Sequence, residues 1–160
     1  MAHQSVSRNY IPQAVAWMAL VSSLGGCTQK ASEPRTDSED NRRIVSQFVR
    51  IFYDERDVRR AFEGYVVPDY VQHNPNIRDG REAAIQALTP LFSNPSVHLE
   101  VRHVLVDGDM AVVHLFARSA PDARGAAVAD IFRLSHGKIV EHWDIIEDIP
   151  EKTANPHPMF

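Results

Sequence analysis

The stretch that most constrains the fold is Ala129–Glu147, ADIFRLSHGKIVEHWDIIE, which predicts two strands joined by a tight turn. The first strand is Ala129–Leu134, and the second, Lys138–Glu147, is rich in β-branched and aromatic residues. Ser135–Gly137 makes the turn, because its glycine adopts positive φ without a steric penalty. Polar groups inside an apolar sheet are costly unless they are paired or used, so they mark a possible site. The hairpin holds Asp130, His142, Trp143 and Asp144.

Three helical segments precede the strands. Apolar residues recur at helical spacing in Asn41–Tyr53, Asp57–Glu63 gives a further turn or two, and a third helix starts at Asp79. From Val97 the period changes to two, and Met110–Arg118 is the return strand of a first hairpin. Helices followed by strands indicate an α+β fold, with the helices on one face of an antiparallel sheet. A strongly curved sheet covered in this way forms a cone, and ligand pockets form in such mouths.

The composition fits one globular domain and restricts its partners. The chain has 160 residues, of which 44% are hydrophobic and 24% charged. A net charge of −4 provides no basic surface for nucleic acid, so no nucleic-acid partner is expected. A polar stretch at residues 28–40 predicts a flexible tether, residues 41–151 form the folded domain, and residues 152–160 form a tail.

Residues 1–27 resemble a bacterial lipoprotein signal peptide. Ala14–Leu24 is an apolar run too short to span a bilayer comfortably, and the Leu-Gly-Gly-Cys sequence that ends at Cys27 is similar to a lipobox. This resemblance implies that Cys27 is lipidated and that the protein is anchored to a membrane of the cell envelope, with no other membrane contact. Alternatively, the segment is an upstream extension or a buried helix, Cys27 is structural, and the protein is cytoplasmic. As the only cysteine, Cys27 excludes an internal disulfide in either case.

Three segments carry a family resemblance: YVQHNP at Tyr70–Pro75, DGREA at Asp79–Ala83 and ADIFRLSHGKIVEHWD at Ala129–Asp144. Together they resemble the SnoaL-like polyketide cyclase family, and the resemblance covers roughly residues 41–151. The family implies the cone-shaped α+β barrel of nuclear transport factor 2 and ketosteroid isomerase. It also implies cofactor-free chemistry such as intramolecular aldol condensation, with Asp130 as the acid/base residue.

The residues that flank Asp130 in the sequence also make it the leading catalytic candidate. It follows an apolar run and precedes Ile131 and Phe132, so it is not a random surface charge, and a carboxylate facing a cavity can act as a general base. The alternative is a structural pair with an arginine or a histidine. His73 lies in a segment that flanking prolines hold extended, and it either shares a proton with Asp130 or ties this segment to the sheet.

Strand alternation divides Glu141–Glu147 between two faces, with Trp143 on one and His142 and Asp144 on the other. Trp143 is favoured as the cavity wall because a flat apolar ring suits a ring-containing ligand, although it could equally fill a core or a dimer interface. His142 and Asp144 then point outward. No His-x-His or Cys-x-x-Cys spacing supports a metal site, so no metal is expected. The remaining pocket candidates are His114, Tyr70 and Phe132.

These observations lead to two functional hypotheses. In the first, Asp130 removes a proton next to a carbonyl of a small hydrophobic compound, and His73 or a water polarises the enolate, without a cofactor. Isomerisation and hydrolysis fit as well as aldol condensation. In the second, the protein is a non-catalytic, lipid-anchored module that binds a small ligand or dimerises. Under both hypotheses, the outer sheet face carries too much apolar surface to stay exposed to solvent, which predicts a homodimer through the sheet.

Overall fold

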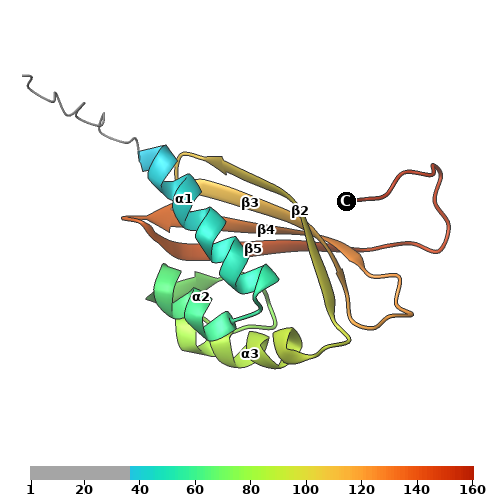
Figure 1. Cartoon of the computed structure of the whole chain (residues 1–160), viewed down its shortest axis with the longest axis horizontal. Coiled ribbons are helices and arrows are strands. Elements are labelled where there is room, and N and C mark those ends of the chain that lie inside the picture. The colour runs from blue at the N-terminus through green and yellow to red at the C-terminus, as the bar shows by residue number, and fades with distance from the viewer. Residues whose placement is uncertain (1–36) are drawn as a thin grey trace, which may run out of the picture. The chain divides into compact units, whose positions relative to one another are not determined.

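The computed structural model describes residues 37–160, so the predicted signal peptide and Cys27 lie outside the described residues. In this part of the chain, no helix is long and apolar enough to cross a bilayer. The elements are α1 (Asp37–Val49), η1 (Arg50–Asp54), α2 (Val58–Tyr65), β1 (Val66–Gln72), α3 (Arg81–Ser93), β2 (His98–Asp107), β3 (Met110–Arg118), β4 (Ala126–Ser135) and β5 (Lys138–Asp148). Apart from β1, which lies between α2 and α3, the helices precede the strands, and the helices and sheet in Figure 1 confirm the α+β prediction.

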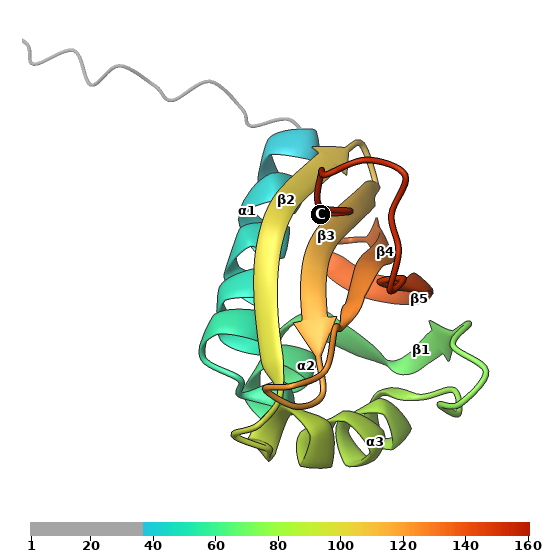
Figure 2. The same cartoon turned by 90° about the vertical axis from the view of Figure 1, so that its right-hand side faces the viewer.

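The five strands form one curled sheet in the order β1-β5-β4-β3-β2. Strands β2 to β5 pair antiparallel with their chain neighbours, whereas β1 runs parallel to β5. The sheet stays open, because its edge strands β1 and β2 are not paired with each other, and Figure 2 shows the helices covering its concave side. The sequence predicted only an extended piece where β1 lies, since its parallel pairing depends on a distant partner.

The predicted hairpin is β4 and β5. Its two-residue turn is His136 and Gly137, and both have positive φ, at 48° and 74°. Two positive φ angles match the right-handed twist of the flanking strands. In this register Asp130 lies directly opposite Asp144, so the two carboxylates start from the same face of the sheet.

Aromatic packing fixes the helices to the sheet. The Phe48 side chain of α1 has no exposed surface, and its ring centroid lies 5.2 Å from that of Phe52, 5.9 Å from that of Phe62 and 5.4 Å from that of Phe132. These contacts join α1, η1 and α2 to β4. A closely packed layer of aromatic side chains therefore covers the inner sheet face over the hairpin.

One long helix was predicted for Asn41–Tyr53, but its last turn is π-helical. The backbone N–H of Glu55 bonds to the carbonyl of Arg50, five residues earlier, at 3.0 Å. Because this turn is wider than an α-helical one, three consecutive side chains are buried in it: Ile51, Phe52 and Tyr53. The π turn thereby brings the Tyr53 hydroxyl toward β4.

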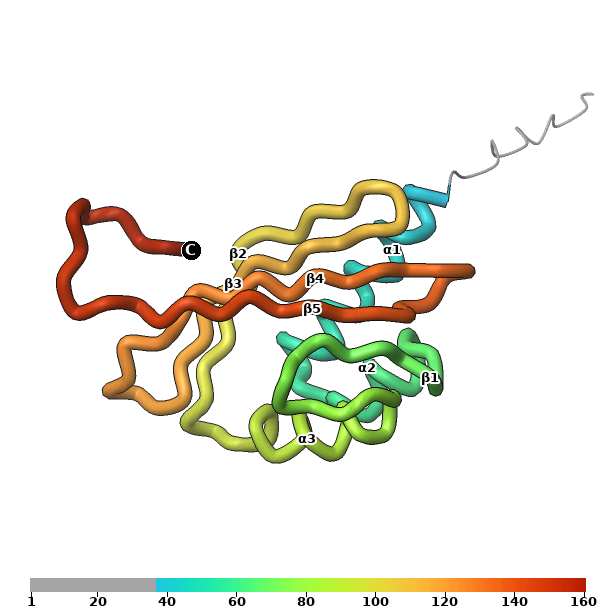
Figure 3. The backbone as a smooth tube through the Cα atoms, turned by 180° about the vertical axis from the view of Figure 1, so that it is seen from behind, coloured from blue at the N-terminus to red at the C-terminus, as the bar shows by residue number. Residues whose placement is uncertain are grey.

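The C-terminal tail returns to the outer sheet face, as Figures 2 and 3 show. The Phe160 ring stacks on Phe116 of β3 at 4.5 Å, and the Arg102 guanidinium lies 5.1 Å from the Phe160 ring centroid. Elsewhere on this face, Leu105 and Ile145 are 60% and 62% exposed. A homodimer through the sheet stays a prediction.

Candidate active site

A pocket of about 360 Å³ opens between the inner sheet face and the helices. Its walls are mainly aromatic and aliphatic, with polar groups contributed by η1, β1, the segment after β1, β4 and β5. An apolar cavity with convergent polar groups is the usual form of a small-molecule site. The polar groups are those of Tyr53, Tyr70, Gln72, Asn74, Asn76, Asp130, His142 and Asp144.

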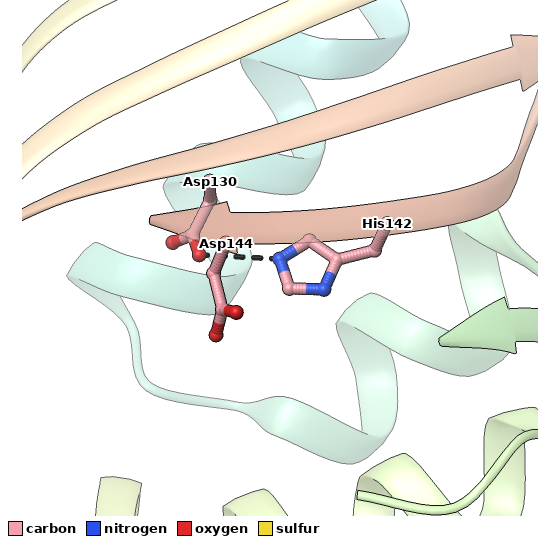
Figure 4. A group of neighbouring side chains, drawn as sticks. All are labelled: Asp130, His142 and Asp144. Atoms are coloured by element: carbon pink, nitrogen blue, oxygen red, sulfur yellow. Dashed lines mark hydrogen bonds and ion pairs between the residues drawn. The ribbon is translucent and has the colours of Figure 1, made fainter. Parts of the chain in front are cut away.

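Asp130 and His142 form a hydrogen-bonded pair at the centre of this polar group. Asp130 Oδ1 lies 3.1 Å from His142 Nε2, and the two side chains are only 14% and 10% exposed. Figure 4 marks this contact with a dashed line. The pairing follows from the register, because His142 lies opposite Phe132, two residues along β4 from Asp130 on the same face. A carboxylate and an imidazole are thus held together in an apolar cavity.

The hydrogen bonds around His142 determine where its protons lie. The side-chain oxygen of Gln72 accepts from the backbone N–H of Asn74 at 2.9 Å, which identifies this atom as Oε1. The same oxygen lies 2.8 Å from Nδ1 of His142, so Nδ1 is protonated and donates. The bond between Nε2 and Asp130 Oδ1 requires one further proton, on either the imidazole or the carboxyl group. The pair therefore shares one proton.

Tyr53 donates its hydroxyl proton to the second oxygen of Asp130. The distance from this hydroxyl to Oδ2 is 2.5 Å. Burial raises the pKa of Tyr53 well above its usual value, and the Asp130 charge and the hydrogen bond raise it further. Burial likewise raises the pKa of Tyr70, with smaller contributions from the charges of Asp130 and Asp144. Both phenols therefore remain protonated at neutral pH.

Asp144 places a second carboxylate beside the pair. Its Oδ2 accepts from Asn74 Nδ2 at 2.5 Å, and the Asn74 amide is oriented by the Asn76 N–H, which bonds to its Oδ1 at 2.8 Å. One ligand atom from each of Asp130, His142 and Asp144 lies within 4.8 Å of the others, so these three residues could hold a cation. Both nitrogens of His142 are already engaged in hydrogen bonds, however.

The predicted assignment of the two faces of β5 is reversed in the structure. His142 and Asp144 line the pocket, whereas Trp143 lies on the outer face, where it stacks on His73 at 4.7 Å between ring centroids. His73 Nε2 lies 2.9 Å from Glu141 Oε1, so this histidine faces away from Asp130. The error has a physical reason: both faces of β5 carry apolar residues, and ring size alone does not identify the inner one.

The other predicted residues divide between the pocket and the outer face. Tyr70, Phe132 and Asp130 line the pocket. His114 lies on the outer face, where its Nδ1 is 3.4 Å from Nδ1 of His103. The residues that sequence reasoning missed are Tyr53, Gln72, Asn74, His142 and Asp144; all but Tyr53 fall in the segments YVQHNP and EHWD, which had already been singled out.

Comparison with known proteins identifies the class of this fold. It is that of nuclear transport factor 2-like proteins, represented by one of unknown function from Mesorhizobium loti (21% identity, 71% of this chain, 96% of that chain, TM-score 0.61). A candidate ketosteroid isomerase from Kribbella flavida has 18% identity over 75% of this chain and 87% of that chain (TM-score 0.60). A candidate SnoaL-like polyketide cyclase from a Jannaschia species has 21% identity over 72% of this chain and 91% of that chain (TM-score 0.56).

The sequence assigns the family. The pattern of the SnoaL-like domain matches residues 45–142, which is more than half of the chain, so this protein belongs to the SnoaL-like family. No curated protein matches the sequence significantly. The likenesses to solved structures lie below 25% identity and establish the fold alone.

Proposed function

We propose that this protein is an acid/base enzyme that needs no cofactor and moves a proton on a small, mainly apolar carbonyl compound. The observation that carries the proposal is the Asp130–His142 pair, which shares one proton inside an apolar cavity. Abstraction of a carbon-bound proton requires a positioned base, and the apolar walls of the cavity favour its reaction with an apolar substrate.

The surrounding groups support separate roles in such a reaction. As a carboxylate, Asp130 accepts the proton from the carbon next to the carbonyl, and His142, held by Gln72, carries the positive charge of the resting pair. Tyr53 holds the other carboxylate oxygen and so fixes the direction of the base. Tyr70 lines the same pocket with a raised pKa, and its protonated phenol supplies a donor for the developing enolate oxygen.

The test is deuterium exchange at the carbon next to the carbonyl, followed by proton NMR in D₂O. The substrates are a panel of small ketones that includes cyclohexanone, acetophenone and 2-tetralone. We expect the wild type to accelerate exchange of at least one ketone, and Asp130→Asn to lower that rate by about 10²–10⁴-fold. The matched control is Glu147→Gln, which neutralises an exposed carboxylate on the outward face of β5.

The controls keep the test decisive. Far-UV circular dichroism verifies that each variant is folded, and Asp130→Ser replaces Asp130→Asn if the latter does not fold. Unchanged exchange in folded Asp130 variants would show that another group is the base. A folded wild type that accelerates exchange of no ketone in the panel would favour a non-catalytic ligand-binding module instead.

A further inference from the structure

The charges that line the pocket do not balance. Asp130 and Asp144 contribute two carboxylates, and His142 is the only basic side chain among the described residues that line it. The proton shared by Asp130 and His142 leaves that pair neutral overall, because it compensates one carboxylate. Among residues 37–160, no lysine, arginine or histidine forms an ion pair with Asp144, whose hydrogen bond comes from the uncharged amide of Asn74.

The negative charge of Asp144 lies at the wall of the cavity. It contributes to the raised pKa of both Tyr53 and Tyr70, whose phenols line the same pocket. Asp144 is itself partly buried, and a partly buried charge is costly unless an opposite charge compensates it. The compensating charge can come from a ligand.

The walls of the pocket also suit a cation. Aromatic rings attract a positive charge over their faces through their quadrupole, and most strongly where water is excluded. An anion would be repelled by the carboxylates, and a neutral ligand would leave Asp144 without an opposite charge. Six aromatic residues line the cavity: Phe52, Tyr53, Phe62, Tyr70, Phe92 and Phe132.

We infer that the ligand of this pocket is an apolar molecule that carries a protonated or quaternary amine, with the ammonium group against Asp144. The inference rests on the proposed function, since the same molecule would present its carbonyl side to Asp130. Asp144 is then a specificity-determining residue, and Asn74 keeps its carboxylate turned into the cavity. The amine and the reacting carbon lie close together, because Asp130 and Asp144 are direct partners across β4 and β5.

A divalent metal ion fits the pocket less well than an organic ammonium. To coordinate a metal, His142 would have to give up its bond to Asp130 or its bond to Gln72. An ammonium group can pair with the Asp144 carboxylate and leaves both hydrogen bonds of His142 intact. The cavity of about 360 Å³ also has room for the apolar part of such a molecule.

The test compares benzyltrimethylammonium, its uncharged analogue neopentylbenzene, and anionic benzenesulfonate, by titration calorimetry and saturation-transfer NMR. We expect the full-length wild type to bind the ammonium about 10-fold or more tightly than the neutral analogue, which corresponds to about 1.4 kcal/mol. Asp144→Asn should reduce this preference to less than about 3-fold. This substitution removes the charge and keeps the size of the side chain, and the Glu147→Gln control should retain the wild-type preference.

Three results would overturn the inference. The first is equal affinity of the wild type for the ammonium compound and its neutral analogue. The second is a preference for the ammonium compound that is unchanged in Asp144→Asn. The third is displacement of the ammonium compound by Zn²⁺ or Mg²⁺, where the metal ion binds the wild type but not Asp144→Asn. The ketone exchange assay separates this inference from the proposed function. If exchange that depends on Asp130 persists without any preference for the ammonium, only the ligand class is wrong; if the preference is present without exchange, the ligand class holds and the proposed chemistry fails.

Discussion

Replacement of Tyr53 by phenylalanine tests whether the pocket holds an ionised, hydrogen-bonded Asp130. Tyr53 is 5% exposed, and its hydroxyl donates to Asp130 Oδ2 at 2.5 Å. A hydrogen bond to a charged group contributes about 1.5–3 kcal/mol to stability, and its loss leaves a carboxylate oxygen without that donor. We therefore expect Tyr53→Phe to lower the free energy of unfolding by about 1.5–3 kcal/mol.

The measurement is urea unfolding followed by far-UV circular dichroism near neutral pH. For a domain of this size the predicted loss corresponds to a decrease in the unfolding midpoint of roughly 1–2 M urea. The matched control is Tyr65→Phe, which removes a hydroxyl bond to the Gln47 side chain at 2.8 Å in an exposed position. Because water replaces that bond, the control should change stability by less than about 0.5 kcal/mol.

The same variant has a signature at alkaline pH. A tyrosine whose pKa is raised in the folded state contributes stability that is fully present below its ordinary pKa of about 10 and is lost as the pH rises toward the folded value. The wild type should therefore lose stability above pH ~10 more steeply than Tyr53→Phe, and the difference between them should narrow. Two results would contradict this prediction. One is a loss of unfolding free energy in Tyr53→Phe that is no larger than the loss in Tyr65→Phe. The other is a stability difference between the wild type and Tyr53→Phe that stays constant as the pH rises above ~10.

Three further predictions concern residues that do not line the pocket. Gly125 has φ +84°, and a Cβ there would lie 2.5 Å from a backbone carbonyl oxygen and from the Phe116 ring. Gly125→Ala should therefore lower the free energy of unfolding in urea by more than about 1 kcal/mol. Gly64 in α2 has open space around it, so Gly64→Ala should raise the free energy of unfolding by about 0.5–1 kcal/mol. The hydrogen bond from His73 lowers the pKa of Glu141. The wild type should therefore lose stability relative to Glu141→Gln as the pH falls below 4.5, the ordinary pKa of a glutamate. Acid-unfolding curves of the two proteins measure this loss, and parallel curves would contradict the prediction.

The order of elements could be predicted because hydrophobic periodicity is local. The change from helical spacing to alternation at Val97 and the turn before Lys138 both depend on near neighbours in the chain. The parallel pairing of β1 with β5 could not be predicted in this way, since it joins residues far apart in the chain, such as Gln72 and His142. The third helix begins at Arg81 rather than Asp79, because the Asp79 carboxylate instead accepts from the backbone N–H of Gln72 at 2.8 Å.

The candidate site was predictable only in part, for a similar reason. Alternation correctly places His142 and Asp144 together and separates them from Trp143, but it does not say which face is the inner one. That choice depends on the helices, which cover the face of Phe132 and Asp130. Tyr53 gives no signal in the sequence, since a regular α-helix through this position would have a different set of inward residues.

The π-helical turn η1 also has an evolutionary consequence. A π turn accommodates one residue more than an α-helical turn, so loss of a single codon within Arg50–Asp54 would restore a continuous helix and rotate Tyr53 away from Asp130. The buried residues of α1, such as Val45 and Phe48, precede the turn and would keep their packing. The partner of the proposed base can therefore be gained or lost in one genetic step while the helix remains attached to the sheet, which gives this scaffold a short route between different chemistries.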